Sequence, residues 1–183
     1  MEQLIYIDKN DISEANKLSA SFAVDSIASR TYINGLAVEL ALKYLVQEGI
    51  SVNNIYNLHD IKKIREEFDI ADIMLPNIHI DVRMVYDENK IFIPKIQYDY
   101  EITPDIYLIF KLSGDGSTAE FLGFINSKSV DKRLSNKDYY FVTKEQLSES
   151  NNVKDYITNF NGNTTEILDK NDTEQAQEFF LSF

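Results

Sequence analysis

Three residues of this chain have the types and the spacing that metal-dependent phosphate chemistry requires. Asp72 lies in a predicted strand at 70–75, and Asp81 and Arg83 lie in the next predicted strand at 78–85. Because side chains alternate along a strand, Asp81 and Arg83 share one face. Two carboxylates on adjacent strands can hold Mg²⁺, which polarises a phosphate and activates water, while a nearby cation stabilises the developing charge.

This arrangement resembles the PD-(D/E)xK nuclease superfamily, in which a helix with an acid precedes a strand with Asp and a strand with (D/E)-x-K. The resemblance implies Mg²⁺-dependent cleavage of nucleic acid, with Asp72 and Asp81 as the metal ligands. Arg83 would stabilise charge, and Glu39, in a predicted helix, would be an accessory acid. The chain departs from the pattern because the expected lysine is Arg83, which cannot transfer a proton.

The competing interpretation of these residues is structural. An exposed polar strand face with a cross-strand or diagonal Asp–Arg pair would have the same sequence pattern. Short patterns of this kind are weak evidence for a site. The sequence therefore favours the structural interpretation and keeps the nuclease as the alternative.

Composition excludes several other classes of function. The chain has 183 residues, a net charge of −12 and no cysteine, which excludes disulfides, thiolate zinc sites and a cysteine nucleophile. With two histidines, any metal ligands would be carboxylates, which suit Mg²⁺, Mn²⁺ or Ca²⁺. An acidic chain is unsuited to a nonspecific grip on nucleic acid or on an anionic membrane. No apolar run approaches the ~18 residues of a membrane span and no signal peptide is visible, so we expect a cytoplasmic location.

The clearest predicted element is a helix. Apolar residues recur at helical spacing from Ile33 to Leu45, which is typical of one wide buried stripe. Shorter helices are predicted at 16–27 and 60–68, and a docking helix is predicted at 153–160.

From residue 70 the apolar pattern has a period of two, which predicts strands. We expect them at 70–75, 78–85, 90–97, 106–112, 119–126 and 139–142. The strand at 90–97 should return from the preceding one in a hairpin, and 106–112 should pair with 119–126. We therefore predict an α+β fold, with N-terminal helices packed on a mixed, largely antiparallel sheet of five to six strands, compatible with a restriction-endonuclease-like fold. Residues 1–160 would form one domain, and 161–183 an acidic, partly apolar C-terminal tail.

Several short blocks, in the same order, resemble a cyanobacterial family catalogued as domain of unknown function 1822. These blocks are Arg30–Val38, Ala71–Pro76, Ile80–Val85, Ile93–Pro94, Ile106–Leu112 and Phe121–Phe124. The third block is similar to the family pattern L-E-C-R-P-V, so arginine at position 83 fits that family. The resemblance spans roughly residues 15–160 and implies no established activity.

The first functional hypothesis is a non-catalytic interaction or regulatory domain without a cofactor. The acidic balance and the apolar end Phe179–Phe183 indicate a protein partner or self-association, and we do not expect nucleic acid or a membrane. The alternatives are the Mg²⁺-dependent nuclease and an acidic inhibitor or immunity-type protein. The positions of Asp72, Asp81 and Arg83 in three dimensions discriminate best between them.

Overall fold

The computed structural model describes residues 3–52, 68–148 and 153–160. Its centre is a five-stranded mixed sheet with the strand order β1-β6-β5-β3-β2, and a second sheet pairs β4 with β7. The strands are β1 Gln3–Tyr6, β2 Asp72–Leu75, β3 Ile78–Val85, β4 Ile91–Pro94, β5 Ile106–Leu112, β6 Thr118–Asn126 and β7 Tyr139–Val142. The helices are α1 Lys9–Ser19, α2 Asp25–Gln47, α4 Lys95–Asp99 and α5 Val153–Thr158, with 3₁₀ turns at Ser127–Ser129 and Lys144–Gln146. The predicted α+β fold is confirmed.

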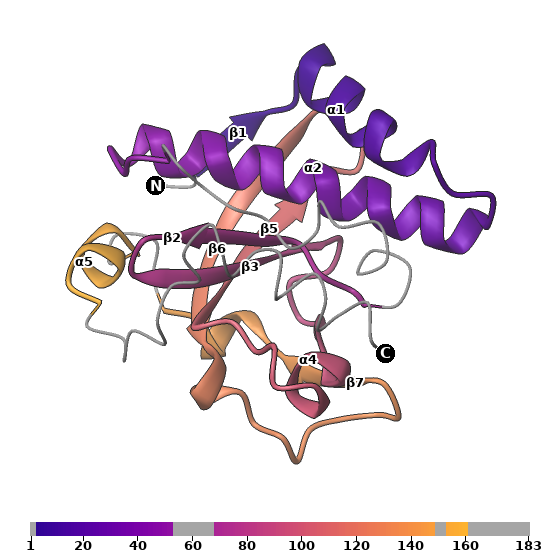
Figure 1. The fold of residues 1–183 in the computed structure, drawn as a ribbon. Coiled ribbons are helices and arrows are strands. Elements are labelled where there is room, and N and C mark those ends of the chain that lie inside the picture. The colour runs from indigo at the N-terminus through magenta and orange to yellow at the C-terminus, as the bar shows by residue number, and fades with distance from the viewer. Residues whose placement is uncertain (1–2, 53–67, 149–152, 161–183) are drawn as a thin grey trace, which may run out of the picture.

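Helix α2 covers one face of the large sheet, while α4 and β7 lie on the other side (Figure 1). The apolar stripe of α2 packs against alternate residues of the central strands, and Tyr44 stacks on Phe121 with ring centroids 4.1 Å apart. Gly35 lets α1 approach α2 closely, because a Cβ there would lie 2.9 Å from Leu18 Cδ1. The helical spacing from Ile33 to Leu45 therefore predicted the core-facing side of α2 correctly.

Two predicted elements differ in the structure. The helix predicted at 16–27 is wrong, because a capping box between Asp8 and Asp11 starts α1 earlier and the helix ends at Ser19. The strand predicted at 90–97 ends at Pro94, which lacks an N–H and has a φ of −63° suited to a helix start.

The small sheet has a pairing that the sequence did not predict. Strand β4 pairs antiparallel with β7 and does not return in a hairpin with β3. The predicted pairing of 106–112 with 119–126 is confirmed, since β5 and β6 are antiparallel neighbours. Most of the helix predicted at 60–68, and the whole of 161–183, lie outside the described residues.

Candidate functional site

The structure brings Asp72, Asp81 and Arg83 together. Asp72 and Asp81 are direct cross-strand partners in the antiparallel pair β2–β3, and Arg83 follows on the same face of β3. That face points away from α2, because the intervening Ile80 and Val82 pack in the core beside α2. The three side chains are buried, at 0%, 1% and 6% exposure respectively. The expectation of an exposed polar strand face is therefore wrong, because α4 and the small sheet cover it.

Arg83 holds Asp81 and Asp69 together. Its Nε and Nη2 both lie 2.5 Å from Asp81 Oδ1. Its Nη1 lies 3.2 Å from Asp69 Oδ1, and Nη2 also donates to the Asp69 carbonyl at 3.1 Å. Such charge-assisted bonds are strong where water is excluded. One buried arginine thus connects β3 to the segment that leads into β2.

Gln97 and Tyr107 complete the polar network from two other elements. The Gln97 amide, on α4, donates to Asp81 Oδ2 at 2.7 Å and to the Asp69 carbonyl at 3.0 Å. Tyr107, which is buried on β5, donates its hydroxyl to Gln97 Oε1 at 2.9 Å. Asp69, Gln97 and Tyr107 were not among the site residues predicted from the sequence. A hydroxyl inside the nearly continuous apolar run 106–112 was the one available signal, since a buried hydroxyl requires a partner.

The network also reaches the helical layer. The Asn34 side chain, on α2, donates to Asp69 Oδ1 at 3.0 Å and to the Ile70 carbonyl at 2.9 Å. Asp69 therefore accepts bonds from α2, β3 and α4. A single aspartate before β2 links three elements that are distant in sequence.

A second pair of polar contacts lies at the other end of the same strand face. His79 Nε2 lies 3.3 Å from Asp72 Oδ2, and the His79 N–H donates to Asp105 Oδ2 at 2.8 Å. The Asp105 N–H donates in turn to the His79 carbonyl. These bonds fix the start of β3 against the segment that enters β5.

Burial and charge shift the titration of these groups. Burial raises the pKa of Asp81 to about 6, an effect that the Arg83 guanidinium opposes and the Asp72 and Asp69 carboxylates increase. Burial also opposes the charge on Arg83, but the Asp81 and Asp69 carboxylates outweigh it and raise the pKa of Arg83. At neutral pH the pair is therefore charged on both sides. For His79, burial favours the neutral form, and the Asp72 carboxylate overcomes this and raises its pKa.

Glu39 occupies a different layer. It is half-buried on α2, the helix that packs against the opposite sheet face from Asp81 and Arg83.

Among the described residues, no group of three or more His, Cys, Asp or Glu side chains could hold a metal ion. Within the same described ranges, no helix has the length and apolar character needed to cross a membrane.

A comparison of the sequence with known protein families shows which family the chain belongs to. The family described as "Protein of unknown function (DUF1822)" matches residues 5–178, which is nearly the whole chain. The chain belongs to this family. The resemblance inferred from the short blocks of the sequence is thereby confirmed, whereas the likeness to the PD-(D/E)xK nucleases stays a prediction. No curated protein and no solved structure matches this member of the DUF1822 family.

Proposed function

We propose that this DUF1822 member is a non-catalytic interaction domain, in which the Asp81–Arg83 pair is a buried structural brace. The observation that supports this most directly is the occupation of the Asp81 carboxylate. One of its oxygens accepts from Arg83 and the other from Gln97. The side chain is 1% exposed.

These hydrogen bonds matter because a catalytic metal needs carboxylate oxygens that are free to bind it. Mg²⁺ binds carboxylates at about 2.0–2.1 Å and retains several water molecules. At Asp81 these positions belong to a guanidinium and an amide, and Arg83 supplies the positive charge that a cation would bring. Replacing the network by a metal would require α4 and β3 to separate.

Strand β1 supplies a surface for a protein partner. It lies at the end of the large sheet and pairs on one side with β6. Its outward side chains are apolar, with Leu4 50% and Tyr6 75% exposed. The strand carries no lysine or proline, the residues that commonly protect such edges from pairing. These features support binding of a second chain, from another protein or another copy, along β1.

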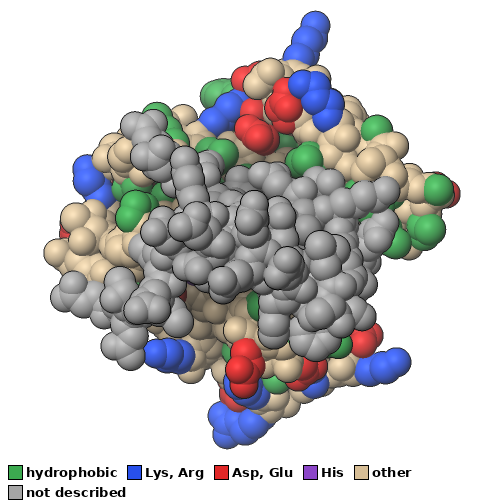
Figure 2. All heavy atoms as spheres, viewed as in Figure 1, with side chains coloured by type: hydrophobic (Ala, Val, Ile, Leu, Met, Phe, Trp, Pro, Cys, Tyr) green, Lys and Arg blue, Asp and Glu red, His purple; other side chains and the backbone are tan. Residues whose placement is uncertain are grey.

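The convergence of Asp72 and Asp81 is the specific observation that favours the Mg²⁺-dependent nuclease as a second candidate. In that case the two aspartates would hold the metal, Arg83 would stabilise charge and Glu39 would be an accessory acid. No comparable observation favours the acidic inhibitor, and both acidic and basic side chains occur among the described residues on the face in Figure 2.

A cleavage assay separates the two candidates. The full-length protein is incubated with Mn²⁺ or Mg²⁺ and with single- and double-stranded DNA and RNA. We expect no cleavage above that of Asp81→Asn. The matched control is Asp131→Asn, which alters a half-buried aspartate paired with the exposed Arg133. Metal-dependent cleavage that Asp81→Asn abolishes and Asp131→Asn retains would overturn the proposal.

A mass measurement by light scattering tests the interaction surface. We expect the protein to form complexes, with itself or with a co-purified protein, above the 21.1 kDa of one chain. The double variant Leu4→Ser with Tyr6→Ser should lose these complexes. The control Tyr86→Ser changes another exposed tyrosine, outside β1, and should retain them. A wild-type chain that is always a free monomer would contradict the interaction role.

A further inference from the structure

The outer side of the small sheet carries a cluster of aromatic side chains that belong neither to the Asp81–Arg83 network nor to β1. Phe92, on β4, packs edge-on against Tyr139 and Phe141 of β7, with ring centroids 5.5 and 5.6 Å apart. Leu134 lies beside them, since its carbonyl accepts from the Phe141 N–H. Phe92 is 38% exposed and Leu134 50%. We call these four side chains the aromatic face.

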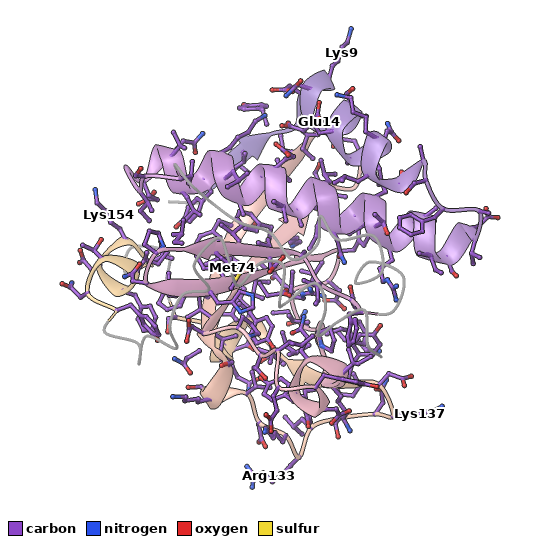
Figure 3. All side chains as sticks on the ribbon, in the orientation of Figure 1. Lys9, Glu14, Met74, Arg133, Lys137 and Lys154 are labelled. Atoms are coloured by element: carbon purple, nitrogen blue, oxygen red, sulfur yellow. The ribbon has the colours of Figure 1, made fainter. Side chains whose placement is uncertain are left out.

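Lysine and arginine residues are frequent near the aromatic face, in contrast to the chain as a whole. Lys90 Nζ lies 5.4 Å from the centre of the Phe92 ring. The segment 128–137, which passes beside β7, carries four lysine or arginine residues and one acid, Asp131, which pairs with Arg133. Asp138 follows this segment directly. Two of these, Arg133 and Lys137, project from the molecule in Figure 3. A chain of net charge −12 thus has one lysine against an exposed aromatic ring and a locally basic segment beside β7.

The C-terminal segment 161–183 has the complementary chemistry. It carries five acidic residues and one lysine, and it ends in Phe179-Phe180-Leu181-Ser182-Phe183. Apolar side chains gain from leaving water, and carboxylates gain from nearby lysine and arginine side chains. We propose that this segment docks on the aromatic face of its own chain, with its phenylalanines on the rings and its acids against segment 128–137.

The length of this segment is sufficient for the docking. The described chain ends at Phe160, where Asn77 donates to the carbonyls of Ile157 and Phe160 and so fixes the departure point near the β2–β3 turn. Figure 1 shows α5 and β7 well apart, so the connection must cross much of the molecule. The 19 residues from Phe160 to Phe179 span up to about 60 Å when extended. A domain of this size has a diameter of about 40 Å, from a radius of gyration of about 16 Å.

A single-stranded nucleic acid is the other occupant that aromatic rings and lysines could fit. Two observations favour the C-terminal segment. The rings pack edge-on against one another, and Lys90 lies over Phe92, so the ring faces that bases would stack on are partly occupied. The net charge of the chain also opposes a polyanion.

Paramagnetic labelling of the full-length chain tests the docking directly. The chain has no cysteine, so Ser182→Cys gives one site for a nitroxide label. We expect the label to broaden the backbone amide signals of 90–94 and 139–142, and to leave those of β1 unchanged. The variant Phe92→Thr with Phe141→Thr should lose this broadening while its β5 signals stay unchanged. The charge variant Lys90→Glu with Lys137→Glu leaves the rings in place and should also weaken the broadening.

Three outcomes would overturn the proposal. The first is the absence of broadening at 90–94 and 139–142 in the wild-type background. The second is broadening that disappears when the labelled protein is diluted with unlabelled chain, which assigns the contact to a second copy. The third is tight binding of a fluorescent single-stranded oligonucleotide that Phe92→Thr with Phe141→Thr abolishes. None of these outcomes depends on whether the Asp81–Arg83 pair is a brace.

Discussion

The two faces of the large sheet are both buried, but different kinds of interaction stabilise them. The face under α2 is apolar, where Leu40, Tyr44 and Phe110 pack with the central strands. The opposite face of β3 carries Asp81 and Arg83, which are bonded to groups from α4 and from the segment before β2. Apolar packing tolerates substitutions that keep volume, whereas a buried polar network requires that every partner is present.

This difference explains how the DUF1822 chain can contain an acid-x-arginine strand whose charged side chains are buried. A buried charge costs several kcal/mol unless it is paired. Asp81 and Arg83 satisfy each other, and Gln97 and Asp69 satisfy the remaining groups. In the proposed function, the acid and the arginine of Asp81-Val82-Arg83 are therefore needed to pair their charges on the covered face.

The largest effect should come from removing one partner of the brace. Arg83→Met leaves the Asp81 carboxylate buried without its counter-charge, and we expect it to lower the free energy of unfolding by about 3–5 kcal/mol. Urea unfolding followed by circular dichroism measures this. The control Arg133→Met breaks a solvent-accessible pair with Asp131, and it should lower the free energy of unfolding far less. Equal effects of the two variants would contradict the contrast between brace and surface pair.

Truncation on the apolar face should have a similar or smaller effect. Leu40 is fully buried on α2, and Leu40→Ala should lower the free energy of unfolding by about 2–5 kcal/mol through lost burial and the cavity left behind. Val46→Ala, on an exposed position of the same helix, should change it by less than about 0.5 kcal/mol. If Leu40→Ala lowered the free energy of unfolding as little as Val46→Ala, the described packing of α2 on the sheet would be contradicted.

The stability of the protein should depend on pH through the contact of His79 with Asp72 on the polar face. Because the folded pKa of His79 is raised above the ordinary 6.5, its contact with Asp72 contributes stability that is fully present below about pH 6.5. That contribution is lost as the pH rises through the raised folded value. We therefore expect the stability difference between wild type and His79→Gln to shrink from mildly acidic to alkaline pH, by urea midpoints. A difference independent of pH would show that His79 does not gain charge stabilisation from Asp72.

The smallest effect should come from a polar atom on the apolar face. The Tyr44 hydroxyl is buried and has no hydrogen-bond partner in the described part of the chain. Tyr44→Phe removes an unsatisfied group and keeps the ring, so the free energy of unfolding should stay within about 1 kcal/mol or rise. Thermal unfolding of Tyr44→Phe is compared with that of Tyr107→Phe. Because the Tyr107 hydroxyl donates to Gln97, we expect its removal to destabilise the protein. A clear loss of stability in Tyr44→Phe would show that the Tyr44 hydroxyl has a hydrogen-bond partner after all.

The sequence predicted the apolar layer better than the polar one. The stripe from Ile33 to Leu45 and the strands 106–112 and 119–126 follow local periodicity, and the structure contains them. The same periodicity placed Asp81 and Arg83 on one face.

Local periodicity could not predict that this face is covered. The cover comes from α4, which starts after Pro94, and from the pairing of β4 with β7 across more than 40 residues. The partners Asp69 and Gln97 have no fixed spacing from Asp81, because tertiary packing alone brings them there. Sequence could therefore name the acid–arginine pair but not its burial.

A double-mutant cycle on Asp81 and Arg83 tests the brace most directly, with the free energy of unfolding as the readout. We predict that Asp81→Leu and Arg83→Met each cost about 3–5 kcal/mol, and that the double variant costs clearly less than their sum, because no unpaired buried charge remains. If Asp81→Leu instead leaves stability unchanged or raises it, and the two effects simply add, the pair is not a brace and the account is contradicted.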